Sequence, residues 1–538
     1  MVRVKAKHKI TTLLAIVLLL LSFSTFSFAA TKAELLKGKK IIYIPLDDRP
    51  VSYDYVNDTF KNLPVQVLIP PKEWISHRTE PANLDKIWNW LEKEALDANV
   101  LVVSADAMVY GGLVPSRRHD LSLETITERV EKFKKLKQIN PKLQIYTFTT
   151  IMRTPRGSVG GTEPDYYDIY GPQIFRITQL LDMKDRELLI QPSEIEELKT
   201  LQDQVPKMSQ DDWFARRDIN FKVNEKWIQW AKDGLIDYLI LCRDDSAEFS
   251  QSQREWRKLK PQSLGLHETR FHAFPGTDEV GMLLITRAIN DLTFSTPQIG
   301  VIYAPGVGGK TVPAYEDLPF EENIAAHIYA LGGFPALNLG SADLVLMVNS
   351  PFKGKTLEAN QPVNDDKSSK QHLVFTKKIQ EQLLLGKRVA IVDMAYGNGA
   401  DRGLMKALSG QNLLYKIDGY AGWNTAGNSL GFALSQGYLS ETYLTRKEIN
   451  RLLTIRYLDD WGYQSIVRNQ VNQDVIWPKK INGTDLSESQ AYVEAYVGLE
   501  MKDFISEYLK EYLPNDIRFK KVEMPWSRMF EVLPILEN

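Results

Sequence analysis

Two adjacent aspartates, Asp244 and Asp245, follow the apolar segment Tyr238–Cys242 and are the first candidates for chemistry in this sequence. Neighbouring carboxyl groups can take unequal roles, because one stays ionised while the pKa of the other rises until it can donate a proton. We therefore predict that Asp245 is a general acid and that Asp244 is its partner. The structural alternative is a turn that begins a helix, where Asp is favoured anyway.

A further carboxylate candidate is Glu279, which follows Gly276, Thr277 and Asp278 after another apolar segment. Acidic residues are common in the first turn of a helix because they complement its dipole, which is the structural explanation. Paired carboxylates are also the machinery of most glycosidases. The sequence thus gives Glu279 as an alternative catalytic carboxylate and Asp278 as a substrate ligand.

Other polar residues at the ends of apolar segments are predicted to bind the substrate. Residues 418–429 contain three glycines, and Trp423 and Asn424 among them offer an aromatic face and an amide. These groups suit a carbohydrate, although Trp423 could instead belong to the core. The full set predicted to bind substrate is Asp47, Asp48, Arg49, Asp106, Arg153, Asp278, Asp393, Asp418, Trp423 and Asn424.

Short apolar segments, most of them followed by helical patterns such as Leu123–Gln138 and Phe320–Leu331, must position these residues. Continuous hydrophobicity is typical of strands buried on both faces of a parallel sheet. Repeated strand and helix patterns therefore predict an α/β fold. The predicted strands are Ile41–Leu46, Val65–Ile69, Val100–Ser104, Leu143–Thr149, Tyr238–Cys242, Phe271–Phe274, Ile299–Tyr303, Leu344–Val348, Val389–Asp393 and Leu413–Asp418.

Polar groups at nearly every strand end favour a (β/α)8-like barrel, in which all strands open onto one mouth. Doubly wound open sheets are the alternative, because the predicted strands outnumber those of such a barrel. After about residue 437 the strand signal stops, and capping patterns such as Thr445-x-x-Glu448 predict helices. We divide the chain into a signal peptide (1–29), an α/β catalytic body (39–437) and a helical C-terminal region (438–538).

The N-terminus is typical of an exported protein, since basic residues precede the apolar run Leu13–Phe28 and small residues stand at Ser27 and Ala29. We expect a secreted or envelope-associated protein without membrane contact after signal cleavage, with an uncleaved anchor as the alternative. The 66 Lys and Arg residues against 68 Asp and Glu give a net charge of −2. This balance argues against a nucleic-acid partner.

No cofactor motif is present in the sequence. Residues 304–311 resemble a nucleotide-binding loop, but Ala304 replaces its first glycine and Pro313 would obstruct the following helix. The histidines lack the helical pairing of a zinc protease, and a carboxylate site for Ca²⁺ or Mg²⁺ stays open. The single cysteine, Cys242, is predicted to be a buried structural thiol.

The chain resembles a bacterial family catalogued as domain of unknown function 4127, from about Lys39 to the C-terminal region. The resemblance implies homology and no particular reaction. The motifs that carry it are Ile44–Val51, Asp244–Glu248, Gly276–Val280, Tyr315–Asp317 and Gly419–Thr425.

The Asp244-Asp245 pair is also similar to the aspartate pair of substrate-assisted β-N-acetylhexosaminidases. This local resemblance implies that Asp244 orients the acetamide of the substrate and that Asp245 protonates the leaving oxygen.

These observations predict an exported glycoside hydrolase with a carbohydrate substrate. The substrate would be a cell-wall or environmental polysaccharide, including polymers with amino sugars, cleaved by carboxylate acid/base catalysis. Two alternatives stay open. One is a metal-dependent hydrolase of phosphate or sulfate esters that uses the same aspartates as ligands. The other is a non-catalytic glycan-binding protein of the cell envelope.

Overall fold

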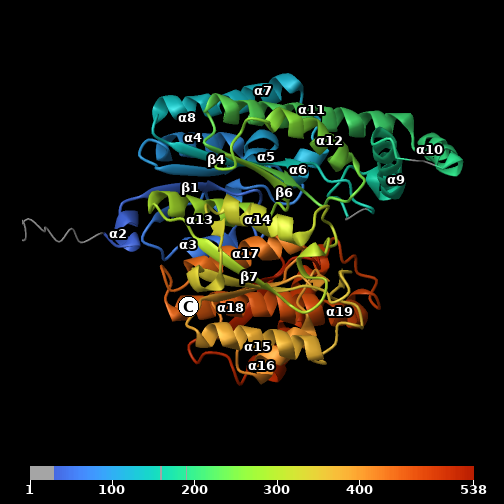
Figure 1. Ribbon diagram of the computed structural model, residues 1–538. Coiled ribbons are helices and arrows are strands. Elements are labelled where there is room, and N and C mark those ends of the chain that lie inside the picture. The colour runs from blue at the N-terminus through green and yellow to red at the C-terminus, as the bar shows by residue number, and fades with distance from the viewer. Residues whose placement is uncertain (1–29, 158–159, 189–190, 538) are drawn as a thin grey trace, which may run out of the picture.

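The computed structural model describes residues 30–157, 160–188 and 191–537. It confirms the predicted α/β fold with parallel strands and a helical C-terminal portion (Figure 1). The predicted signal peptide, residues 1–29, lies outside the described residues. Within the described part of the chain, no helix combines the length and the apolar character that crossing a lipid bilayer requires.

The N-terminal half of the chain builds a sheet of six parallel strands. These are β1 (Lys40–Ile44), β2 (Gln66–Leu68), β3 (Val100–Ser104), β4 (Gln144–Ile151), β5 (Tyr238–Arg243) and β6 (Phe271–Pro275). Their order in space is β2-β1-β3-β4-β5-β6. Successive side chains face opposite sides, so that Ile42 and Ile44 enter one core while Ile41 and Tyr43 enter another.

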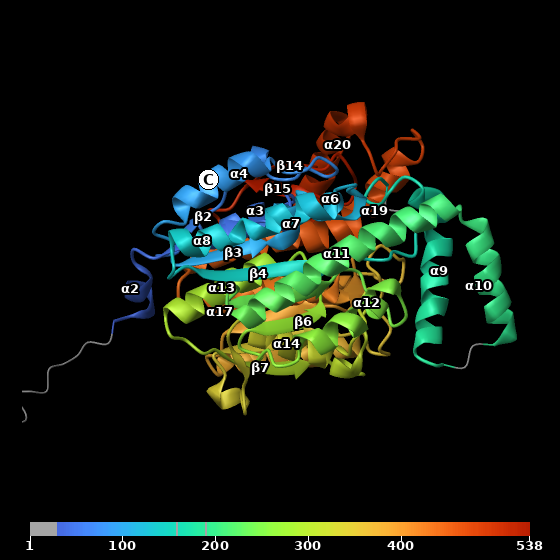
Figure 2. The same cartoon turned by 90° about the horizontal axis from the view of Figure 1, so that it is seen from above.

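The helices of this half cover both faces of the first sheet or extend away from it. They are α2 (Lys32–Leu36), α3 (Asp54–Phe60), α4 (Leu84–Glu94), α5 (Ala105–Tyr110), α6 (Leu113–Arg118), α7 (Leu123–Glu131), α8 (Phe133–Ile139), α9 (Tyr167–Asp185), α10 (Pro192–Gln204), α11 (Lys207–Asp233) and α12 (Gln251–Leu259), with short 3-10 turns at Lys72–Trp74 and Lys260–Ser263. Helices α4, α5, α7, α8 and α11 pack on the outer face, and α3 packs on the inner one. Helices α9 and α10 project from the body (Figure 2).

A second parallel sheet follows, formed by β7 (Gln298–Tyr303), β8 (Phe334–Pro335), β9 (Leu344–Asn349), β11 (Val389–Asp393) and β13 (Gly419–Ala421). A separate short pair joins β10 (Leu357–Glu358) to β12 (Tyr396–Gly397). The order of the second sheet is β13-β11-β9-β7-β8. Read from the opposite end, the order is β8-β7-β9-β11-β13. When these strands are counted along the chain, the second one is at the edge, followed by the first, third, fourth and fifth. The first five strands of the first sheet have the same order.

The strands are therefore divided between two open sheets and do not form the single barrel that the sequence favoured. In the described residues, the outer strands β2 and β6 of the first sheet do not pair with each other, and neither do β13 and β8 of the second. The doubly wound alternative describes the arrangement. Polar groups follow so many strands because two sheets, rather than one barrel, present their carboxyl ends to a common region.

Between the sheets lies a layer of helices, so that the body alternates helix and sheet layers (Figure 1). The helices of the second half are α13 (Val280–Leu292), α14 (Phe320–Ala330), α15 (Lys370–Leu384), α16 (Arg402–Gly410) and α17 (Ala426–Leu439), with 3-10 turns at Gly308–Lys310 and Leu339–Ser341. Helix α13 packs on α17, and α17 packs on β11 and β13.

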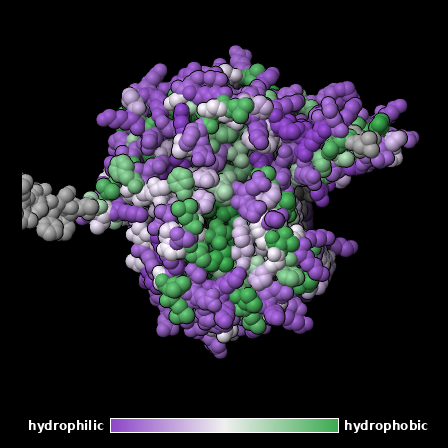
Figure 3. Space-filling view, viewed as in Figure 1, coloured by the Kyte–Doolittle hydropathy of each residue, from purple (hydrophilic) through white to green (hydrophobic). Residues whose placement is uncertain are grey.

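The face of the molecule shown in Figure 3 is mostly polar, with an apolar hollow near its middle.

The C-terminal portion is helical as predicted, but it ends in a pair of strands that the sequence did not predict. Its helices are α18 (Arg446–Arg456), a π-helical stretch (Tyr457–Val467), α19 (Arg468–Val471), a second π-helical stretch (Asn472–Ile476), a 3-10 turn (Ser487–Ser489), α20 (Gln490–Phe504) and a last π-helical turn (Ile505–Leu509). Strands β14 (Phe519–Glu523) and β15 (Leu533–Leu536) pair antiparallel. The segment between them reaches the candidate site.

Most predicted strands are present, and two elements differ from the prediction. The predicted helix Leu123–Gln138 is two helices, which meet at Lys132. The predicted strand Leu413–Asp418 begins only at Gly419, as β13. The apolar side chains before Gly419 are buried without joining the sheet, because burial alone does not distinguish a strand from an irregular core segment.

Candidate active site

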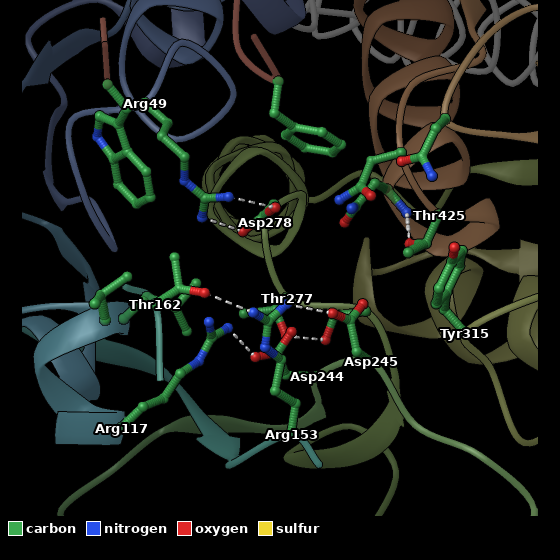
Figure 4. A pocket seen from close by; sticks show the side chains of 18 of the residues that line it. Arg49, Arg117, Arg153, Thr162, Asp244, Asp245, Thr277, Asp278, Tyr315 and Thr425 are labelled. Atoms are coloured by element: carbon green, nitrogen blue, oxygen red, sulfur yellow. Dashed lines mark hydrogen bonds and ion pairs between the residues drawn. The ribbon is translucent and has the colours of Figure 1, made fainter. Parts of the chain in front are cut away.

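A cavity of about 180 Å³ lies where the carboxyl ends of both sheets meet. Its walls come from the loops that follow β1, β4, β5 and β6 of the first sheet and from the segments after β7, β12 and β13. Helix α6 and residues 526–530 complete them (Figure 4). Ligands of open α/β sheets bind outside the carboxyl ends of the strands. The predicted residues that line this cavity are Arg49, Arg153, Asp244, Asp245, Asp278 and Asn424.

Arg49 joins two carboxylates on one wall of the cavity. Its guanidinium donates to Asp47 at 2.7 Å and to Asp278 at 2.6 Å. All three side chains are almost fully buried. The charged triplet that follows β1 is thus tied directly to the loop after β6.

Two more arginines hold the Asp244-Asp245 pair on the opposite wall (Figure 4). Arg117 donates to Asp244, and Arg153 donates to Asp245 at 2.6 Å. Arg153 also contacts the buried carboxylate of Glu163 at 2.6 Å. The neighbouring aspartates therefore differ in their cation partners, as unequal roles would require.

Backbone strain is concentrated at this cavity. Four of the twelve non-glycine residues with positive φ in the described chain line it: Asp245 (φ 35°), Tyr315 (φ 68°), Asn398 (φ 59°) and Asn424 (φ 58°). Residues with side chains occupy the left-handed region only at a cost, and such residues cluster at functional sites. The loops around the cavity are therefore held in a specific shape.

Burial changes the proton affinity of three lining carboxyl groups. It raises the pKa of Asp278 to about 7, against the opposing effect of the Arg49 charge. It raises the pKa of Glu316 to about 8, although Asn323 and the backbone N–H of Gly427 donate to that carboxyl group. Burial also raises the pKa of Asp245, and the charge of Arg153 only partly opposes it. The cavity can therefore hold carboxylic acids near neutral pH.

Two buried amide oxygens face the cavity without a hydrogen-bond partner in the described residues. They are Oδ1 of Asn398 and Oδ1 of Asn428. The amide of Asn398 is oriented by donating to Glu358 at 2.7 Å. Buried polar atoms are normally satisfied, so these oxygens are suited to accept hydrogen bonds from ligand hydroxyl groups. The half-exposed ring of Tyr315 adds an aromatic surface beside them.

Asp47, Asp48 and Asp106 support the cavity from behind and do not line it. Asp47 holds Arg49, and Asp48 accepts from the indole nitrogen of Trp526 at 2.7 Å. Asp106 accepts from the backbone N–H and the hydroxyl of Thr150, and burial raises its pKa to about 7. These three were predicted to bind substrate directly, but they lie behind the residues that line the cavity.

Glu279 and Trp423 are also placed outside the cavity. Glu279 is fully buried, where it accepts from the N–H of Thr277 at 2.9 Å and contacts His327 at 3.1 Å. Trp423 packs in the core against Phe530. Their burial leaves neither side chain facing a substrate there.

Asp393 and Asp418 belong to the second sheet and lie elsewhere as well. Asp393 is buried at the end of β11 and accepts from Asn349 and Tyr420. Asp418 precedes β13, so it stands at the amino end of that strand, where it accepts from the N–H of Val389 and pairs with Arg446. The late start of β13 explains why Asp418 is at the wrong end for the cavity.

Several lining residues were not predicted from the sequence. Arg117 lies in α6, and no sequence motif around it indicates a role in the site. Glu316 lies in the segment Tyr315–Asp317, which the family resemblance had already singled out. The remaining ones are Leu113, Val114, Thr162, Gly276, Thr277, Tyr315, Asn398, Thr425, Asn428, Trp526, Arg528 and Phe530. The guanidinium of Arg49 lies over the indole ring of Trp526, so the C-terminal segment closes the site.

The described residues contain no group of three or more His, Cys, Asp or Glu side chains arranged to hold a metal ion. The lining aspartates are bound by arginines instead, and a divalent cation would have to displace those arginines. Cys242 is buried behind the cavity, and burial raises the pKa of its thiol well above the usual value. Its predicted role as a structural thiol fits this placement.

Comparison with known proteins places the chain in a family. No curated protein and no solved structure matches it. A family model with the description "Protein of unknown function (DUF4127)" matches residues 41–533, nearly the whole chain. The matched region includes both sheets, the candidate cavity and the C-terminal segment that closes it. The chain therefore belongs to this family.

Proposed function

We propose that this chain is a glycoside hydrolase that acts, after export, on a cell-wall or environmental polysaccharide, including polymers with amino sugars. The observation that supports it is one cavity whose carboxyl groups differ in proton affinity and in cation partner. Glycoside cleavage needs one carboxyl group that donates a proton and a second that remains anionic.

Asp245 is the proton donor in this proposal. Its side chain is 25% exposed, against 7% for Asp278, so it is the more accessible of this pair. Burial raises its pKa toward the range in which it can protonate a leaving oxygen. Asp244, held by Arg117, is the neighbouring carboxylate that completes the pair.

The remaining lining groups fit recognition of a sugar. The amide oxygens of Asn398 and Asn428 can accept hydrogen bonds from hydroxyl groups, and Arg49 and Arg153 can donate to ring or substituent oxygens. Tyr315 offers its ring to an apolar sugar face.

The test is a panel of cell-wall polysaccharides and aryl glycosides, including N-acetylglucosaminides, with released reducing ends as the readout. The wild-type protein should cleave at least one member. Asp245→Asn should lower kcat by about 10²–10⁴-fold, the range of a general acid. Asp203→Asn, which removes an exposed carboxylate of α10, should leave turnover unchanged.

Two outcomes would replace the proposal. Glycan binding without turnover across the whole panel would indicate a non-catalytic binding protein. Cleavage of phosphate or sulfate esters that is lost with a chelator and restored by a divalent ion would indicate the metal-dependent class.

A further inference from the structure

A second pocket, of about 470 Å³, lies at the carboxyl edge of the second sheet and shares no lining residue with the candidate active site. Strand β7 has β8 on one side and β9 on the other, so the strand order reverses at this point. The pocket is lined by Ala304 and Pro305, which follow β7, and by Asn349 and Ser350 at the end of β9. This is the position where doubly wound sheets bind their ligands.

The buried hydroxyl of Ser350 lacks a hydrogen-bond partner that a ligand could supply. The side chain is only 4% exposed, it lines the pocket, and its oxygen has no hydrogen-bond partner in the described residues. A buried hydroxyl without a partner costs free energy, and nearly all buried polar groups in proteins are satisfied. An oxygen of a bound ligand would supply the missing partner.

Three lysines line the same pocket as this hydroxyl. Lys353, Lys355 and Lys367 line the pocket, and no carboxylate in the described chain pairs with the first two. Lys367 lies 3.4 Å from Asp365 and is itself largely exposed. Asp401, the carboxylate in the pocket wall, is already bound by the side chains of Asn349 and His372. The pocket therefore offers free cations to a ligand and no free anion.

The N-terminus of α15 opens into the same pocket. Ser369 caps the helix, and the backbone N–H groups of Lys370 and Gln371 have no intrahelical acceptor. The imidazole of His372 accepts from the N–H of Ser369 at 3.1 Å with Nδ1, so its proton is on Nε2 and faces Asp401. His372 is thus bound to the carboxylate of Asp401, while the positive end of the α15 dipole faces the ligand.

Apolar side chains complete the pocket beside the charged groups. The ring of Phe352 is 54% exposed, and Tyr396 and Val363 stand with it in the wall. A ligand that is only a bare anion would leave these rings unused, whereas one with an organic group would cover them.

We propose that this pocket binds a small organic phosphate monoester, with the phosphate held by Ser350, the lysines and the N-terminus of α15. The organic group lies against Phe352 and Tyr396. This inference does not depend on glycoside cleavage at the first cavity, and it concerns different residues.

The test is isothermal titration of the full chain with phenyl phosphate and, separately, with inorganic phosphate. Phenyl phosphate should bind saturably and more tightly than inorganic phosphate. The double variant Lys353→Ala/Lys355→Ala should weaken its binding by about tenfold or more, since each charge-assisted contact contributes strongly. The matched control Lys377→Ala/Lys378→Ala removes two lysines of α15 that do not line the pocket, and it should bind as the wild type does.

Ser350→Ala separates a built site from general charge attraction. It keeps both lysines and should still weaken phenyl phosphate binding several-fold. Tighter binding of inorganic phosphate than of phenyl phosphate would overturn the organic part of the proposal. Absence of saturable binding up to about 10 mM, or equal binding by the wild type and the double lysine variant, would overturn the site.

Discussion

The two sheets share one strand order, yet their carboxyl edges carry different chemistry. The edge of the first sheet presents carboxylates bound to arginines, as in the pairs Arg49–Asp278 and Arg153–Asp245. The edge of the second sheet presents a buried serine hydroxyl and exposed lysines. The same backbone scaffold thus positions acids at one edge and cations at the other, because function depends on the loops rather than on the fold.

The difference also concerns how each edge compensates charge. At the first edge the pairs of Arg49 with Asp47 and Asp278 are nearly fully buried, so these two acids depend on that arginine. At the second edge Lys353 and Lys355 are exposed and solvated. We therefore expect the two edges to respond very differently to loss of a cation, to pH and to salt.

Removing a cation from each edge should give the largest contrast. Arg49→Met leaves Asp47 and Asp278 buried without their cation, and we expect it to lower the free energy of unfolding by about 3–5 kcal/mol. Lys355→Met at the second edge should change it by about 0.5 kcal/mol or less. Urea denaturation measures both, and equal effects would show that the first edge does not rely on its ion pairs.

Each edge contains a glycine with positive φ, and alanine substitutions test whether both positions require glycine. A Cβ on Gly276 would lie 2.0 Å from Oε1 of the buried Glu279, and one on Gly306 would lie 2.6 Å from the backbone oxygen of Phe352. Either alanine variant should cost about 2 kcal/mol. Gly498→Ala in α20 has open space and should be neutral or stabilising by up to about 1 kcal/mol. Thermal unfolding of the three variants decides this, and a Gly306 variant as stable as the wild type would break the parallel.

Acid should affect the two edges in opposite directions. Burial raises the pKa of Asp106 to about 7, so the folded state binds its proton more tightly than the unfolded state does. Its contribution to stability is therefore lost as pH rises, by about 1 kcal/mol between pH 6 and pH 8. Asp106→Asn should flatten the stability profile by that amount, and an unchanged slope would contradict the assignment.

Asp401 is the counterpart at the second edge. Burial alone would raise its pKa, but the hydrogen bonds from His372 and Asn349 lower it overall. Its contribution to stability is present above the pKa of the unfolded state and is lost as pH falls. Chemical denaturation between pH 3 and pH 5 should therefore show Asp401→Asn losing less stability on acidification than the wild type; an equal loss would count against the pairing.

Salt should give the smallest of these contrasts. Exposed lysines are screened, so phenyl phosphate binding at the second edge should weaken several-fold between about 50 and 500 mM salt. The stability difference between the wild type and Arg49→Met should stay almost constant over the same range, since buried pairs are screened less. Titration and urea denaturation at both salt concentrations measure this, and salt-independent binding would argue against the lysines.

The sequence was sufficient to predict the α/β class and most strands, because runs such as Val100–Ser104 are short, apolar and bounded by polar residues. It also predicted Asp244, Asp245 and Asp278, which line the cavity, since strand ends have a fixed place in such folds. It could not predict Arg117, whose partner Asp244 is 127 positions away. Pairings over that distance leave no local pattern.

The misplaced residues have equally specific reasons. Trp423 has the glycines and amides of a binding loop as neighbours, yet its indole enters the core. Asp418 was predicted to be the last residue of a strand, but the strand begins only with the next residue. The choice between one barrel and two sheets depends on which strands pair, and hydrophobicity alone does not encode pairing.

The most direct test of the central claim, that Asp245 donates a proton in glycoside cleavage, is the leaving-group dependence of the Asp245→Asn variant. We predict a large loss of turnover on a glycoside with a basic leaving group and near-normal turnover on the 2,4-dinitrophenyl glycoside of the same sugar, whose leaving group needs little protonation. Equal loss on both substrates, or no loss on either, would contradict the account.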